Sequence, residues 1–178
     1  MIHTIQTERL FIRRIRAEDW KDIQAIWVSA AKSVYAQYDR PNDLDDDSVQ
    51  TRVADLDLFA ESDAHIFLAV CLKNRVIGYF SLNSRGEGYE LGYCFHSDFH
   101  GKGYARESLR AVLRSLRDWG VPFVEAGTAL RNKPSLRLLR SLGFELCGTE
   151  KVSFYQDAEG KDIFFDGGIF VRRLDCDL

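Results

Sequence analysis

The chain has 178 residues, 46% of them hydrophobic, which suits one domain with a substantial buried core. Its 24 Lys and Arg residues stand against 27 Asp and Glu residues, for a net charge of -3, and this balance argues against nucleic acid or an anionic membrane as a partner. The longest strongly apolar run, residues 66–72, is far shorter than the roughly 20 residues of a membrane-spanning helix. The N-terminus lacks a basic-then-apolar signal pattern, so we expect a single cytoplasmic domain over residues 1–178.

The first third of the chain predicts a strand and two helices. Charged and apolar residues alternate over Arg9–Ile15, as in a half-buried strand, and apolar residues recur at helical spacing over Ala17–Lys32. A second helical pattern over Val49–Phe59 follows four aspartates at 43, 45, 46 and 47. These carboxylates suit the positive end of a helix dipole.

From His65 onward the pattern is mainly that of strands. Three strands separated by short turns predict an antiparallel meander, over His65–Leu72, Val76–Asn83 and Tyr89–Phe95. Next come a helix from Ala105 to Gly120, a strand, a short helix from Pro134 to Leu142, and a closing strand pair. These last strands are expected over Val121–Thr128, Phe144–Tyr155 and Ile163–Arg173. The element order predicts an α/β (α+β) fold.

Cysteine and histidine spacing gives no sign of a metal site. The cysteines at 71, 94, 147 and 176 are widely separated and form no Cys-x-x-Cys pair. The histidines at 3, 65, 96 and 100 have no helical metal-ligand spacing. We therefore expect core thiols, no structural disulfide and no metal.

Residues 93–107 place a strand, a glycine loop and a helix start in direct succession. Free backbone N–H groups and the helix dipole at such a join attract anions, and glycines let a phosphate approach the backbone. The segment is neither a Walker loop, which needs four residues between its glycines, nor a dinucleotide fingerprint, because Arg106 replaces the third small residue. A pyrophosphate-binding loop or a simple tight turn at Gly101 and Gly103 both remain open.

Several segments together resemble the GNAT superfamily of N-acetyltransferases. His100-x-x-Gly103-x-Ala105 is similar to its Arg/Gln-x-x-Gly-x-Gly/Ala pattern, with His100 at the first position. Within this superfamily the chain most resembles the ribosomal-protein N-terminal acetyltransferase (Rim-type) branch. The similar segments are Thr7–Arg13, Glu90–Tyr93, Gly101–Ala105, Asn132-x-x-Ser135 and Gly143-Phe144. The resemblance implies the GNAT fold: a central mixed, largely antiparallel sheet of about seven strands flanked by about four helices.

The resemblance also implies acetyl-CoA as co-substrate, without a metal. The pantetheine arm would lie between the strand ending near Phe95 and the strand over Val121–Thr128, which splay apart. The implied contacts are backbone groups of Tyr93, Cys94 and Phe95, the loop residues His100, Gly101, Lys102, Gly103, Tyr104, Ala105 and Arg106, and the side chains of Asn132 and Ser135. Asn132 is equally suited to capping the helix at Pro134.

The implied reaction is transfer of the acetyl group to a primary amine by direct attack in a ternary complex. Such attack needs a base for the ammonium and an acid for the leaving thiolate. Glu90, acting directly or through water, is the predicted base, with ordered water alone as an alternative. Glu90 is otherwise a strand-edge carboxylate paired with a surface Lys or Arg. Leu139 stands where many relatives carry a Tyr acid, so Ser135, with Tyr155 as a second candidate, is the predicted acid. Ser135 is also suited to bonding Asn132 at the helix start.

The acceptor is expected between the first two helices and the closing strands, with Trp27, Tyr35 and Tyr38 as aromatic walls or core residues. It is a protein or peptide N-terminus or a small-molecule amine. The alternative function is a non-catalytic acetyl-CoA-binding protein of the same fold. Monomer or homodimer, and the acyl-chain preference, are left open.

Overall fold

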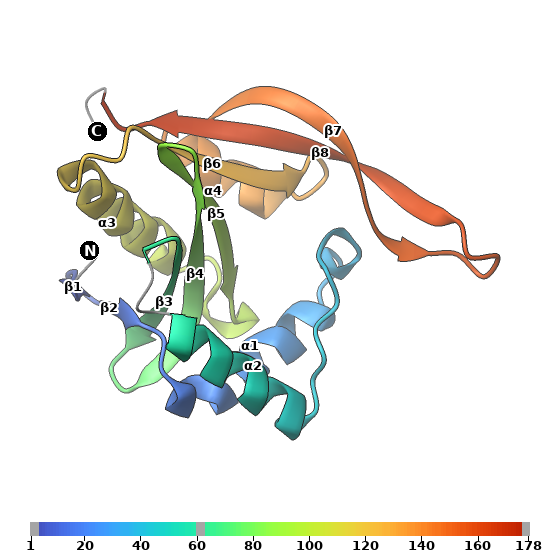
Figure 1. Cartoon of the computed structure of the whole chain (residues 1–178), viewed down its shortest axis with the longest axis horizontal. Helices are drawn as coiled ribbons and strands as arrows, with labels where there is room; N and C mark the ends of the chain where they lie inside the picture. Colours follow the sequence, from blue (N-terminus) through green and yellow to red (C-terminus); the bar gives the residue numbers. More distant parts are fainter. Residues whose placement is uncertain (1–3, 60–62, 176–178) are drawn as a thin grey trace.

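The structure, a computed structural model, describes residues 4–59 and 63–175 (Figure 1). Its strands are β1 (Ile5–Gln6), β2 (Phe11–Arg14), β3 (His65–Leu72), β4 (Arg75–Arg85), β5 (Gly88–Phe95), β6 (Phe123–Ala129), β7 (Glu145–Gln156) and β8 (Asp162–Arg173). Its helices are α1 (Trp20–Ala31), α2 (Asp46–Leu58), α3 (Tyr104–Asp118) and α4 (Lys133–Ser141), with 3-10 turns η1 (Ala17–Asp19), η2 (Ala36–Tyr38) and η4 (Ser97–Phe99). Within the described ranges, no helix is both long and apolar enough to span a membrane.

The strands form one sheet in the order β1-β2-β3-β4-β5-β6-β8-β7. Every neighbouring pair is antiparallel except β5 and β6, which confirms the mixed, largely antiparallel sheet. It has eight strands where about seven were expected. The additional strand is the short β1, which folds back on β2 through a turn in which the Thr7 N–H donates to the Leu10 carbonyl at 2.9 Å.

Helices cover both faces of the sheet. One core cluster joins α3 and α4 to one face, through Leu113, Leu139 and their neighbours, and a second joins α1 and α2 to the other, through Ile26 and Val53. Alternate residues of β3 serve the two clusters, with Leu68 facing α3 and its neighbours facing α1. A strand covered on both faces explains the unbroken apolar run that stood out in the sequence.

The sheet opens between β5 and β6. These strands pair only at Tyr89↔Val124 and Glu90↔Glu125, after which β6 continues against β8 and β5 against β4. Figure 1 shows the β6–β8–β7 part of the sheet turned away from the lower half of β5. The splay implied by the family resemblance is therefore present, and it leaves one side of the carboxyl half of β5 without a strand neighbour.

The cysteines divide according to sheet position. Cys71 is buried, Cys94 is partly buried and Cys147 is exposed, whereas Cys176 lies outside the described residues. The expectation of a core thiol at Cys147 was wrong, because β7 is the edge strand of the sheet and this position points to solvent. No group of residues able to hold a metal ion is present in the described ranges.

Candidate active site

The loop between η4 and α3 has backbone geometry suited to binding an anion. Gly101 and Gly103 have φ values of +71° and +81°, which residues with a Cβ rarely adopt, and α3 begins at the next residue, Tyr104. Within the part of the chain that the structure describes, the backbone N–H groups of residues 101–106 make no hydrogen bond. A row of free amides at the N-terminus of a 15-residue helix is suited to a pyrophosphate.

Side chains around the loop hold its shape. His100 Nε2 lies 2.8 Å from the Phe95 carbonyl oxygen, so His100 ties the loop to the end of β5. Lys102 Nζ donates to the Asp98 carbonyl at 2.7 Å. His100, which replaces an Arg or Gln of the family pattern, is thus engaged inside the loop, and the free backbone amides are the groups left for a ligand.

Arg9, in the turn between β1 and β2, contacts the same loop, which the sequence did not reveal. Its guanidinium donates to the Lys102 carbonyl at 3.0 Å, forms an ion pair with Glu107 at 2.6 Å and lies 4.5 Å above the centre of the Tyr104 ring. Burial of Glu107 raises its pKa, but hydrogen bonds from Thr7 and Arg9 outweigh this and leave the pKa lowered. Glu107 therefore stays ionised at neutral pH and keeps the loop preformed.

Across the splay, Tyr93 on β5 meets Ser135 at the start of α4. The two hydroxyl oxygens are 2.6 Å apart, and burial raises the pKa of Tyr93 to about 12, with the hydrogen bond from Ser135 opposing the shift. The Asn132 side chain accepts from the Ser135 backbone N–H at 3.3 Å, which confirms Asn132 as a cap. Ser135 therefore bonds Asn132 through its backbone and leaves its hydroxyl for Tyr93. The sequence placed both residues in the site but not their contact.

Glu90 lies at the last paired position of β5 and β6, on the same face as Cys94. Its Oε2 is 3.7 Å from Arg85 Nη1, and Arg85 Nε is also 4.0 Å from Glu125 Oε1. The pairing with a surface cation, considered from the sequence, is therefore present. The Glu90 side chain is 46% exposed, so this pair is screened by water.

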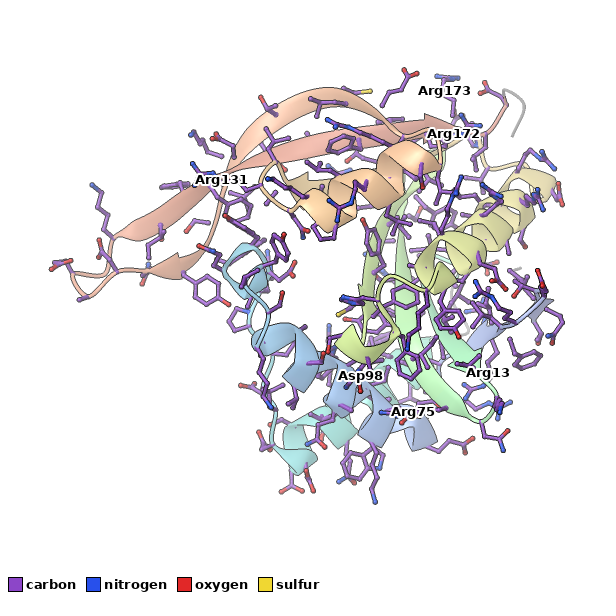
Figure 2. The ribbon with its side chains drawn as sticks, turned by 180° about the vertical axis from the view of Figure 1, so that it is seen from behind. Arg13, Arg75, Asp98, Arg131, Arg172 and Arg173 are labelled. Atoms are coloured by element: carbon purple, nitrogen blue, oxygen red, sulfur yellow. The ribbon has the colours of Figure 1, made fainter. Side chains whose placement is uncertain are left out.

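A cavity of about 610 Å³ lies between η2 and the β7–β8 hairpin. It is lined by η2 residues Ala36, Gln37 and Tyr38, by Ala129 and Arg131 after β6, and by hairpin residues Tyr155, Gln156, Ile163, Phe164, Phe165 and Asp166. The η2 turn is seated on the hairpin, because the Tyr155 hydroxyl donates to the Ala36 carbonyl at 3.3 Å. The Tyr38 and Phe165 rings also meet edge to face at 5.2 Å. Figure 2 shows Arg131 beside the hairpin and well apart from Asp98 of the η4 loop.

The residues that line the cavity agree only in part with the aromatic walls predicted for the acceptor site. Tyr38 lines the cavity as expected. Tyr155, the second candidate for the acid, also lines the cavity and is not part of the Tyr93–Ser135 pair. Trp27 is core, 7% exposed, with its indole N–H donating to the Tyr79 hydroxyl at 3.1 Å. Tyr35 is not among the lining residues. The apolar contribution of the hairpin, Ile163 to Phe165, was not singled out in the sequence, because these residues look like ordinary strand positions.

The structure combines a sheet that opens after Glu90 with a helix that starts directly after a glycine loop. The family model described as an acetyltransferase (GNAT) domain matches residues 9–145. The chain therefore belongs to the GNAT acetyltransferase family, as its motifs indicated.

Among proteins similar to this chain is the L-amino acid N-acetyltransferase AaaT of Escherichia coli (strain K12), 23% identical over 85% of this chain and 94% of the relative. Solved structures with the same fold include the ribosomal-protein-S5-alanine acetyltransferase from Vibrio fischeri (TM-score 0.81, 18% identity, 98% of each chain covered). They also include the ribosomal L7/L12 alpha-N-protein acetyltransferase RimL in complex with coenzyme A (TM-score 0.81, 17% identity, 98% of this chain and 100% of that one).

Proposed function

We propose that this protein transfers the acetyl group of acetyl-CoA to a primary amine by direct attack in a ternary complex. The observation that carries the proposal is the row of unbonded amides at residues 101–106 beside a sheet that opens after Glu90. The loop amides bind the pyrophosphate. The pantetheine follows the edge of residues Tyr93–Phe95 that has no strand neighbour. The thioester supplies the acetyl group and its leaving thiolate.

Tyr93 and Ser135 supply the proton for that thiolate. Their hydroxyls are in contact, and the raised pKa of Tyr93, about 12, keeps it protonated at neutral pH. Ser135 stands in the first turn of α4, whose positive dipole end favours a developing anion. A hydroxyl pair there can donate a hydrogen bond to the sulfur as the C–S bond breaks. Tyr155, the second candidate from the sequence, lies instead in the wall of the cavity.

For the base, the sequence points to Glu90, and its place on the α1 face of the sheet suits that role. The Arg85 contact competes for its carboxylate. Turnover with a panel of amines distinguishes the proposed enzyme from a non-catalytic acetyl-CoA-binding protein: acetyl-CoA binding without acetylation of any peptide or small amine would contradict the proposal.

Acetyl-CoA is expected to raise the melting temperature of the protein. A ligand held only by the native state at 100 times its Kd stabilises that state by about 2.7 kcal/mol, which is roughly 5–10 °C for a domain of this size. Calorimetric scans with and without acetyl-CoA measure the shift. An unchanged melting temperature with acetyl-CoA and with longer acyl-CoAs would mean that no acyl-CoA site exists.

The cavity next to η2 is proposed to receive the acceptor. Peptide N-termini and free amino acids, named for RimL and AaaT respectively, both place a side chain beside the amine. The aromatic and aliphatic wall from Tyr38, Ile163 and Phe165 fits an apolar side chain there.

We expect acceptors with a Phe or Leu side chain next to the amine to exceed the matched glycine acceptor by at least about tenfold in kcat/KM, since burying such a side chain contributes roughly 1.5–3 kcal/mol. A peptide-library and amino-acid screen measures this preference. Phe165→Ala should reduce it, because Phe165 lines the cavity. Equal rates for glycine and phenylalanine acceptors would place the acceptor elsewhere.

A further inference from the structure

Arg131 lies in the wall of the cavity between η2 and the β7–β8 hairpin, in the turn that joins β6 to α4. The backbone of this turn is fixed by hydrogen bonds. The Asn132 N–H donates to the Ala129 carbonyl at 2.9 Å, and the next N–H along the chain donates to the Arg131 carbonyl at 3.0 Å. Ala129 and Arg131 both line the cavity, and Figure 2 shows Arg131 beside the hairpin. The Arg131 side chain therefore starts from a fixed point in the cavity wall.

Most of the uncharged polar side chains in this wall already donate to other protein groups. The donors are Gln37 to the Val34 carbonyl at 3.2 Å, Gln156 to the Asp162 carboxylate at 3.1 Å and Tyr155 to the Ala36 carbonyl at 3.3 Å. By contrast, the Arg131 guanidinium and the Tyr38 hydroxyl, which line the same cavity, have no hydrogen bond or ion pair within the part of the chain that the structure describes. Both groups can donate hydrogen bonds, so the cavity wall offers unused donors to a ligand oxygen.

The charge that the wall leaves uncompensated is the one on Arg131. The charged residues that line the cavity are Arg131 and Asp166. The Asp166 carboxylate lies 2.7 Å from Lys151 Nζ, and the hydrogen bond from Lys151 lowers the pKa of Asp166. The charges of this pair cancel, whereas the Arg131 guanidinium has no carboxylate at ion-pair distance among the described residues. The cavity is therefore suited to a ligand with one anionic group.

The same turn leads from the cavity to the proposed proton donor. Asn132 follows Arg131 directly, caps α4, and accepts from the Ser135 backbone N–H at 3.3 Å. The Ser135 hydroxyl in turn lies 2.6 Å from the Tyr93 hydroxyl. Residues 129–135 thus form one short, hydrogen-bonded segment with the cavity wall at one end and the hydroxyl pair at the other. A ligand bound to Arg131 lies on the side of the helix start from which an amine can approach the thioester.

We propose that Arg131 binds the α-carboxylate of a free amino acid and that a free amino acid is the acceptor, an inference that rests on the proposed acetyl transfer and on this cavity as the acceptor site. In an amino acid the carboxylate, the side chain and the amine share one carbon atom. With the carboxylate on Arg131 and the side chain against Tyr38 and Phe165, the amine is the group left to face the thioester. The planar guanidinium matches a carboxylate through two parallel hydrogen bonds. A peptide N-terminus has a neutral amide in place of that carboxylate.

An amino acid and its own amide test the inference, because the two acceptors differ only in the carboxylate. The pair is L-phenylalanine or L-leucine, whichever is acetylated faster, and the corresponding amino acid amide. We expect the amino acid to exceed its amide by at least about tenfold in kcat/KM, the scale of one hydrogen bond to a charged group. This preference opposes intrinsic reactivity, because the amine of the amide is less basic and more of it is neutral near pH 7. The same residue followed by glycinamide represents a peptide N-terminus and should behave like the amide.

Arg131→Gln should remove the preference for the carboxylate. Arg131 is exposed, so the substitution should leave the melting temperature nearly unchanged. We expect a loss of about tenfold or more in kcat/KM for the amino acid, mainly through a higher KM, because the carboxylate is held equally in the ground state and the transition state. The rate with the amide should stay near that of the wild type. Arg131→Lys keeps the charge without the planar fork and should be intermediate.

Arg114→Gln is the matched control, since Arg114 is an exposed arginine of α3 and does not line the cavity. It should keep both the wild-type rates and the preference for the carboxylate. A wild-type protein that acetylates the amide as fast as the amino acid would overturn the inference, and so would an Arg131→Gln variant that retains the preference. Acetylation of peptides or other amines but of no free amino acid would overturn it and leave the proposed function intact. A protein that binds acetyl-CoA but acetylates no amine would overturn both together.

Discussion

Gly103→Val is expected to abolish the thermal shift produced by acetyl-CoA. Gly103 has a φ of +81° and carries one of the free amides that face the proposed pyrophosphate. A Cβ at this position would lie 3.3 Å from Arg9 Nη2, so a valine would crowd the guanidinium that holds the loop and push the backbone out of this conformation. Each lost hydrogen bond to a charged group is worth about 1.5–3 kcal/mol, so losing two weakens binding at least about 10²-fold. Titration calorimetry with acetyl-CoA measures the loss directly.

Gly86→Val is the control for backbone strain. Gly86 lies in the β4–β5 turn with a φ of +60° and open space around its Cβ position, so the valine meets a similar left-handed strain, about 1–2 kcal/mol, away from the loop. Both variants should therefore melt at lower temperatures than the wild type without ligand, but only Gly86→Val should retain the acetyl-CoA shift. If Gly103→Val binds acetyl-CoA as tightly as Gly86→Val does, the pyrophosphate site is not at this loop.

Tyr93→Phe is expected to lower turnover by roughly 10²- to 10³-fold with little change in acetyl-CoA affinity, the usual range for a lost general acid. The Tyr93 hydroxyl is buried against Ser135, and no other hydroxyl contacts this pair among the described residues. Its raised pKa, about 12, keeps the Tyr93 hydroxyl protonated at neutral pH and able to donate a hydrogen bond to the developing thiolate. Steady-state kinetics together with thermal shifts separate the loss of turnover from any loss of binding.

A double-mutant cycle shows whether the two hydroxyls act as one unit. Ser135→Ala should lower turnover by a similar factor, and the double variant should be no slower than the slower single variant, because groups that act together lose their effect together. Asn132→Ala is the comparison for the helix start: it removes the cap, at about 1 kcal/mol of stability, and leaves both hydroxyls. Fully multiplicative losses in the double variant would mean that Tyr93 and Ser135 act independently.

The glycine loop and the helix start after it could be predicted from the sequence because their determinants are local in the chain. A positive φ at Gly103 and a helix that starts at the next residue need only neighbouring residues to form, and the free amides follow from the helix start itself. The same is true of Asn132, whose capping bond reaches three residues along the chain. The helices and strands were also found in order, since the periods of their apolar residues are local patterns.

The tertiary structure alone decided which side chains meet. Tyr93 and Ser135 are 42 positions apart, and Arg9 and Glu107 are 98 apart, so no spacing rule joins them. These residues meet because α3 and α4 pack on one face of the sheet. Local sequence thus determined the glycine loop and the helix start that follows it, whereas long-range packing decided the contact between the two hydroxyls and the cavity between η2 and the β7–β8 hairpin.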